Sequence, residues 1–149
     1  MAAHAQTLSG TWLAVTAGVD SIEHGFAISP ELAAEMATRG TALVPTLLVA
    51  REAAERGWYV KEPVRAAHDR SFANCLAAGV RIALGTDVGG FEWTGISQAK
   101  EFALMTGLGM PQADALRAGT IVAADLLGLD GKGRGHRAGC GGRHRRRHR

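Results

Sequence analysis

The sequence has 149 residues, 46% hydrophobic and 21% charged, which is typical of one ordinary globular domain and excludes a wholly disordered chain. The formal net charge of +3 is unevenly distributed, because residues 131–149 hold eight of the 17 basic residues and no acidic residue. Residues 1–130 therefore carry nine basic and 14 acidic residues, a formal charge of −5, so any nucleic-acid binding would depend on the last residues alone.

Helices and strands are predicted to alternate along residues 1–130. Alternating apolar residues and turn signals predict strands over residues 19–23, 41–46 and 80–84, and a shortened strand before His4. Apolar residues at helical spacing predict helices over residues 7–17, 30–39, 63–78, 96–106, 111–118 and 120–127, with a looser stretch around Gly57 and Trp58. Four strand–helix units in succession predict a parallel sheet, because parallel neighbours require a crossover helix.

Polar side chains stand where the predicted strands end. His4, His24, Thr46 and Asp87 each occupy such a position. A doubly wound sheet would satisfy the same alternation, but the carboxyl ends of the strands are where a (β/α)8 barrel carries its chemistry. Two imidazoles and a carboxylate are ligands suited to zinc or a similar divalent ion. One histidine at a strand end is more often structural, so the metal hypothesis depends on their joint placement.

Five segments resemble the amidohydrolase superfamily, most closely its branch of imidazolonepropionase-like enzymes and Xaa-Pro dipeptidases. They are AHA at 3–5, AGVDSIEHG at 17–25, VPT at 44–46, AGVRIALGTD at 78–87 and GMPQADAL at 109–116. The order and separation of IEHG and GTD are the most specific part, and the resemblance covers nearly all of residues 1–130. It implies the C-terminal half, about strands 5 to 8, of a (β/α)8 TIM-type barrel.

The resemblance also implies roles for single residues. His4 matches the metal-binding histidine that ends the fifth barrel strand, His24 the one that ends the sixth, and Asp87 the aspartate that ends the eighth. In the family this aspartate is also catalytic: it takes a proton from the metal-bound water and passes it to the leaving group. Glu23 and Thr46 are expected to orient a ligand or contact substrate. Trp93, in the loop after Asp87, is placed to line a substrate pocket, with packing in the core or a lid as the alternative that we favour. Glu23 could equally be an ordinary polar residue on the alternate face of its strand.

The implied activity is the hydrolysis of a carbon–nitrogen bond, in a cyclic amide or a dipeptide, with a divalent metal, zinc in a binuclear site. The family's first-strand His-x-His pair and its fourth-strand ligand are absent, so we expect the chain alone to be incomplete. The alternative is a noncatalytic fragment or a basic-tailed nucleic-acid-binding protein. His68, in a predicted helix, is interpreted as a surface or packing residue rather than a ligand.

Residues 131–149 have no apolar periodicity and are expected to form a disordered basic tail after the partial barrel of residues 1–130. Arginine codons read in another frame can give a valine-rich strand, so the tail is interpreted as a frameshift product that binds no specific nucleic acid. The open edges of a partial barrel predict an oligomer, or association with a missing N-terminal half.

Three features that the sequence lacks suggest the cellular compartment of the protein. Cys75 and Cys140 give no disulfide framework and no metal-binding spacing, residues 1–4 lack the features of a secretory signal, and no apolar run is long enough to span a membrane. We therefore expect a cytoplasmic protein that is not embedded in a membrane.

Overall fold

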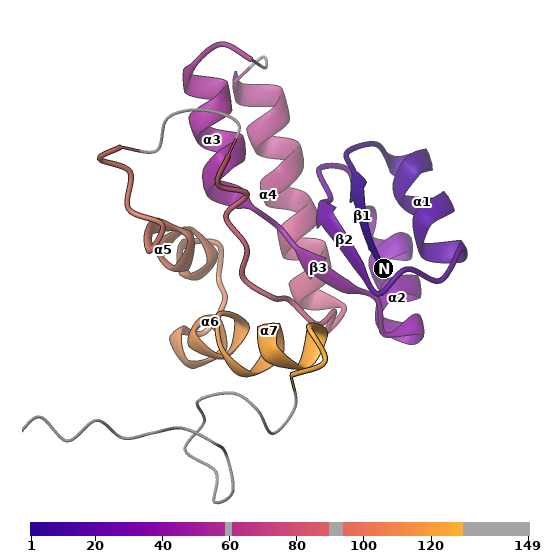
Figure 1. The fold of residues 1–149 in the computed structure, drawn as a ribbon. Helices are drawn as coiled ribbons and strands as arrows, with labels where there is room; N and C mark the ends of the chain where they lie inside the picture. The colour runs from indigo at the N-terminus through magenta and orange to yellow at the C-terminus, as the bar shows by residue number, and fades with distance from the viewer. Residues whose placement is uncertain (59–60, 90–93, 130–149) are drawn as a thin grey trace, which may run out of the picture.

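A computed structural model describes residues 1–58, 61–89 and 94–129 (Figure 1). Three parallel strands form one sheet in the order β1-β2-β3: β1 (Ala2–Ala5), β2 (Ser21–His24) and β3 (Ala42–Val44). Ala5 pairs with His24, and Glu23 pairs with Val44. This register aligns the carboxyl ends of the three strands at the same edge of the sheet.

Seven helices accompany the sheet in the described part of the chain: α1 (Leu8–Thr16), α2 (Pro30–Arg39), α3 (Leu47–Glu55), α4 (Lys61–Ala77), α5 (Lys100–Gly107), α6 (Gln112–Ala118) and α7 (Ile121–Leu126). As Figure 1 shows, α1 lies beside β1 and β2, and α3 and α4 lie side by side. The expected mixed α/β fold with a parallel sheet is confirmed. None of the helices in the described ranges is long and apolar enough to cross a membrane.

Local sequence signals fix the ends of the early helices as expected. The Thr7 hydroxyl accepts a hydrogen bond from the Gly10 amide at 3.1 Å, and the Ser29 hydroxyl accepts one from the Leu32 amide at 3.2 Å. Pro30 is the first residue of α2, where its missing N–H costs nothing, and Gly40 ends the helix with a φ of 73°. These caps define the loops that connect the strands.

The predicted strand at 80–84 is shorter in the structure. Only a single parallel bridge joins Ile82 to Leu43, with the Leu43 amide donating to the Arg81 carbonyl and the Ala83 amide donating to the Leu43 carbonyl, both at 2.9 Å. The Leu84 amide then donates to the carbonyl of Ala118 in α6. The segment therefore lies beside β3 as expected. Its next residue, Leu84, is hydrogen-bonded to α6 instead of to the sheet.

The prediction missed α3 altogether. Its apolar residues have helical spacing, and five of them are buried: Leu47, Leu48, Ala50, Ala53 and Ala54. The start of the helix has no local cap, because the Thr46 side chain forms no capping hydrogen bond to it. The sequence places Thr46 at the end of the predicted strand at 41–46, so the helix that begins after it was not predicted. The predicted tail at 131–149 lies outside the described residues.

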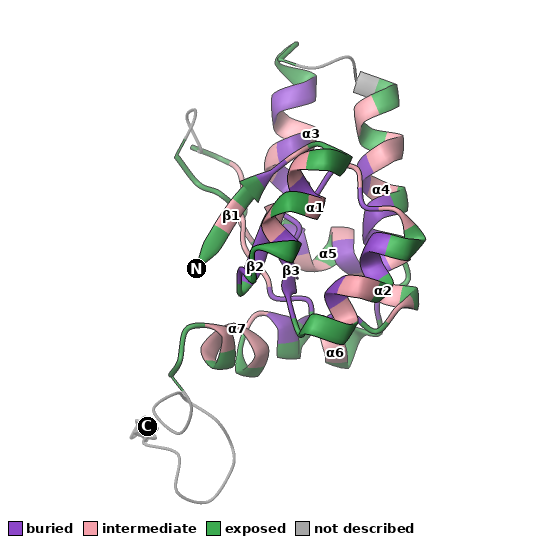
Figure 2. Ribbon diagram, turned by 90° about the vertical axis from the view of Figure 1, so that its right-hand side faces the viewer, coloured by how far each residue is buried: buried purple, intermediate pink, exposed green. Residues whose placement is uncertain are grey.

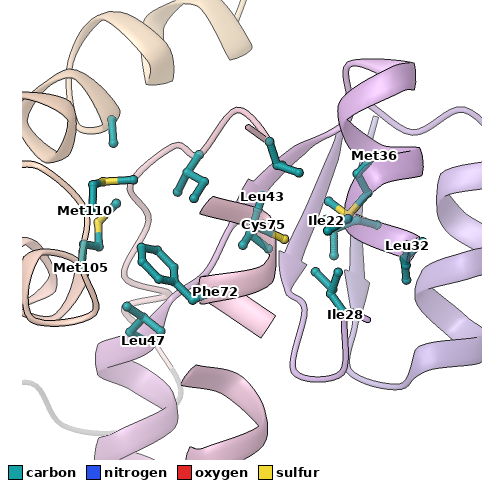
Figure 3. Close-up of a cluster of buried hydrophobic side chains, with 14 of the residues drawn as sticks. Ile22, Ile28, Leu32, Met36, Leu43, Leu47, Phe72, Cys75, Met105 and Met110 are labelled. Carbon is teal, nitrogen blue, oxygen red and sulfur yellow. The ribbon is translucent and has the colours of Figure 1, made fainter. Parts of the chain in front are cut away.

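One apolar core joins the sheet to its helices. Ile22 and Leu43 from the sheet, Leu32 and Met36 from α2, Leu47 from α3, Phe72 from α4 and Met105 from α5 are all at most 1% exposed (Figure 3). Each such side chain stabilises the fold by about 1.5–3 kcal/mol relative to an exposed one. Figure 2 shows the same distribution, with the buried residues of α3 and α4 on their inward sides. By contrast, α7 has no buried residue.

Gly85 begins the GTD segment because its backbone passes very close to β3. A Cβ atom built on Gly85 would lie 2.5 Å from Cγ1 of Val44, which is shorter than any ordinary contact. Asp87 follows two residues later. The close approach therefore fixes where the loop that carries Asp87 leaves the sheet.

We expect Gly85→Ala to lower the free energy of unfolding by about 1–3 kcal/mol, because the added methyl group overpacks against Val44. Urea denaturation measures this change. The matched control is Gly89→Ala, since no atom lies within 4 Å of a Cβ at Gly89. In a Val44→Ala background, Gly85→Ala should cost less. Equal losses in Gly85→Ala and Gly89→Ala would contradict the close-approach explanation.

Candidate functional site

The candidate residues gather at the carboxyl edge of the sheet. His4 lies in β1, His24 is the last residue of β2, Thr46 follows β3, and Asp87 follows the extended segment beside β3. Because the strands are parallel and in register, their ends deliver these four residues to one edge. The alternation of strands and helices in the sequence predicted these residues at this edge.

The two histidine rings are direct neighbours. Their centroids lie 4.4 Å apart with an interplanar angle of 70°. His24 is 6% exposed, whereas His4 is exposed. Burial lowers the pKa of His24, a charge on His4 lowers it further, and the carboxylate of Asp87 opposes them. At neutral pH His24 is therefore an uncharged imidazole, which is the form that binds a metal ion.

The Thr46 hydroxyl holds the ring of His24. Nδ1 of His24 lies 2.7 Å from Oγ1 of Thr46, and both side chains are buried. When Nδ1 carries the proton it donates to this oxygen, and Nε2 is then an unprotonated donor atom. Such a partner on the second ring nitrogen fixes the orientation of a metal-binding histidine.

His68 fixes the backbone of the same residue. Its Nε2 lies 3.0 Å from the carbonyl oxygen of His24, and its ring packs against Phe26, with the centroids 4.5 Å apart. The side chain is only 2% exposed, so the surface interpretation is wrong, and His68 is a buried packing residue in α4. Burial lowers the pKa of His68 to about 4, although the carbonyl groups of His24 and Pro45 favour the protonated ring.

The backbone is unusual at three of the candidate residues. Among the residues that the structure describes, only His24, Thr46 and Asp87 combine a side chain with a positive φ, at 70°, 50° and 49°. This left-handed region is costly for a β-branched threonine in particular. Each strained position costs of order 1–3 kcal/mol and persists only where the surroundings determine it. Strain confined to the strand ends points to a functional site there.

The structure brings the predicted ligands together only in part. His4 and His24 are adjacent, and the Asp87 carboxylate is near enough to raise the pKa of His24. Within residues 1–58, 61–89 and 94–129, however, no three His, Cys, Asp or Glu side chains form a group that could hold a metal ion. Trp93 lies outside the described residues.

Glu23 lies beside a hollow on the sheet. The Ser21 hydroxyl donates to its carboxylate at 2.6 Å. Ser21 and Glu23 line a hollow of ≈ 480 Å³ together with Val44, Leu84 and residues of α7. His4 pairs with Glu23 in the sheet, so the two residues face the same side. The hollow therefore continues from the polar edge along one face of the sheet.

Comparison with known sequences identifies the family. Residues 1–134 match the model of the amidohydrolase family. The chain is 36% identical over 129 residues to an uncharacterized protein of Mycobacterium tuberculosis, across 78% of this chain and 34% of that protein. An uncharacterized protein of Mycobacterium bovis matches with the same values. The chain thus spans about a third of the length of these relatives.

Solved structures agree with this assignment. One is a Xaa-Pro dipeptidase with methionine bound in its active site, similar with a TM-score of 0.77 and 33% identity over 88% of this chain and 34% of that chain. Another is a prolidase in complex with N-methylphosphonate-L-proline, with a TM-score of 0.78 and 30% identity over 89% of this chain and 34% of that one. The resemblance predicted from the IEHG and GTD segments is confirmed, including its Xaa-Pro dipeptidase branch.

Acid should remove the stabilisation that neutral His68 provides. In the unfolded chain His68 becomes protonated below pH 6.5, whereas in the folded chain it becomes protonated only near pH 4. Between these pH values the contribution of His68 to the free energy of unfolding therefore falls by roughly 3 kcal/mol. Glu101 acts in the opposite sense, because its raised pKa of about 7 lets the folded chain bind a proton first.

Comparison of the wild type with His68→Gln at each pH cancels the contribution of Glu101. We expect the stability advantage of the wild type, measured by urea denaturation, to shrink as the pH falls from 6.5 to 4. An advantage that stays constant across this interval would contradict the buried neutral state of His68.

Proposed function

The chain belongs to the amidohydrolase family, and on this premise we propose that its strand-end residues serve the metal-dependent hydrolysis of a carbon–nitrogen bond. The family is one of hydrolases. The observation that carries the proposal is the pair of adjacent imidazoles, His4 and His24, of which His24 is kept neutral with its Nδ1 occupied by Thr46. This leaves Nε2 of His24 as a metal-binding atom.

The donor set fits part of a metal site. His4 and His24 would hold a divalent ion, zinc being the one that imidazole nitrogens suit best, with Asp87 as a further oxygen donor. When bound, the ion lowers the pKa of a water molecule towards 7. A catalytic zinc ion usually takes three protein ligands, so further ligands would come from a segment outside these residues, either an N-terminal half or another chain. That arrangement is the partial barrel expected from the sequence.

Asp87 is the proposed acid–base group. Its carboxylate is exposed at the strand end and its charge reaches His24. In the proposed reaction it accepts a proton from the attacking water as the new C–O bond forms. It then gives this proton to the leaving nitrogen as the C–N bond breaks, so the carboxylate is regenerated. A side chain anchored at a strand end can serve both steps because it stays beside the reacting atoms.

The proposed substrates are dipeptides. Support comes from the two similar structures, a dipeptidase with bound methionine and a prolidase with a phosphonate analogue that contains proline. Cyclic amides remain the second class to assay. Thr46 is proposed to orient His24, and Glu23 to contact substrate from the hollow.

A fusion tests the proposal. The chain is joined behind the N-terminal segment of a prolidase relative, and hydrolysis of Xaa-Pro dipeptides is assayed with added Zn²⁺. His136, His144 and His148 are replaced by Gln, and Cys140 by Ser, throughout so that the end of the chain cannot bind the ion. We expect Asp87→Asn to lower kcat by roughly 10²–10⁴-fold while most of the bound zinc is retained, because the amide oxygen can still coordinate the ion but cannot accept a proton. His4→Ala and His24→Ala should lose zinc as well as activity.

Asp114→Asn is the matched control, since Asp114 is an exposed carboxylate paired with Arg117 in α6. It should keep both zinc and turnover. Full turnover by Asp87→Asn, or unchanged zinc content in both histidine variants, would overturn the proposal.

A further inference from the structure

Thr46 begins α3 without capping it. Threonine at the N-cap of a helix ordinarily accepts a hydrogen bond from an amide in the first turn. Here its backbone is left-handed, with φ 50° and ψ 46°, and its side chain makes no capping hydrogen bond. The hydroxyl lies instead against Nδ1 of His24. The first amides of α3 therefore need an acceptor from elsewhere.

Glu101 of α5 provides this acceptor. The Leu47 amide donates to its Oε1 at 2.8 Å, and the Leu48 amide donates to its Oε2 at 2.7 Å. The side chain is completely buried. A carboxylate at a helix N-terminus gains both from these charge-assisted hydrogen bonds and from the helix dipole. Glu101 thus performs, from a distant part of the sequence, the task that Thr46 does not perform.

This arrangement is costly for the fold. Burial raises the pKa of Glu101 to about 7, against the opposing effects of the Leu48 and Leu47 amides and the Arg51 guanidinium. A threonine in extended backbone would cap the same helix with neither a buried carboxylate nor a strained φ. Together, the buried Glu101 carboxylate and the left-handed backbone of Thr46 leave the Thr46 hydroxyl facing the His24 imidazole instead of the helix.

We propose that Glu101 is a positioning residue for His24: by capping α3 in place of Thr46, it directs the Thr46 hydroxyl to Nδ1 of His24 and thereby holds the imidazole ring in the orientation that leaves Nε2 free of this contact. The effect on the ring stands on the contacts alone, and its consequence for metal binding rests on the proposed function. A purely structural role, tying α5 to α3, would leave His24 unaffected.

Side-chain ¹⁵N NMR of the metal-free chain separates the two roles. At pH 8, above the pKa values of His24 and Glu101, we expect Nδ1 of wild-type His24 to give a single signal, at the shift of a nitrogen hydrogen-bonded to the Thr46 hydroxyl. Glu101→Gln has a single acceptor oxygen for the two amides. Thr46 then relaxes to cap the helix, and the Nδ1 signal of His24 should move away from its wild-type position.

Three further variants make the result decisive. Thr46→Val should move the Nδ1 signal in the same way, and adding Glu101→Gln to it should cause no further change at His24. Met105→Ala loosens the same helix, α5, without touching the cap, so it should lower the melting temperature and leave His24 unchanged. If Glu101→Gln does not fold, Glu101→Asp is measured, whose shorter side chain reaches one amide and should give an intermediate shift.

Wild-type His24 signals in folded Glu101→Gln or Glu101→Asp would overturn the proposal, and so would a second change when Glu101→Gln is added to Thr46→Val. A subsequent Zn²⁺ titration of the fusion protein, with His136, His144 and His148 replaced by Gln and Cys140 by Ser, should show an affinity about 10- to 100-fold lower for Glu101→Gln. A changed Nδ1 signal with unchanged zinc affinity would count against the metal site of the proposed function and leave the positioning role intact.

Discussion

The hydrogen bond between His24 Nδ1 and Thr46 Oγ1 joins the ends of two adjacent parallel strands, and the rest of the site is arranged around it. It requires the β2–β3 register, which sets Glu23 opposite Val44 and so brings the two following loops together. It also requires left-handed backbone at both residues, which His68 supports by donating to the His24 carbonyl. This single contact thus links sheet register, backbone strain and the protonation of a candidate ligand.

Part of this arrangement is readable from the sequence. His24 and Asp87 stand at strand ends in segments, IEHG and GTD, whose resemblance to amidohydrolases the family match confirms. The start of α2 is also readable, because Ser29 and Pro30 are local signals of a helix N-terminus. Both kinds of information lie within a few residues of the feature that they predict.

The supporting residues could not be predicted in this way. Glu101 lies in an amphipathic helix, where a glutamate normally faces solvent, and its partners Leu47 and Leu48 are far away in the sequence. His68 likewise meets His24 only through the packing of α4. Nor does the sequence show that Thr46 leaves α3 uncapped, because threonine is an ordinary N-cap residue and only the structure places its side chain against His24.

Anomalous diffraction at the zinc absorption edge, from crystals of the fusion protein grown with Zn²⁺, tests the central claim most directly. The account predicts an anomalous peak within bonding distance of Nε2 of His24, about 2.0–2.1 Å, with His4 as a second ligand and the Thr46 contact at Nδ1 retained. Zinc bound through Nδ1 of His24, with Thr46 displaced, or zinc found only away from His4 and His24, would contradict it.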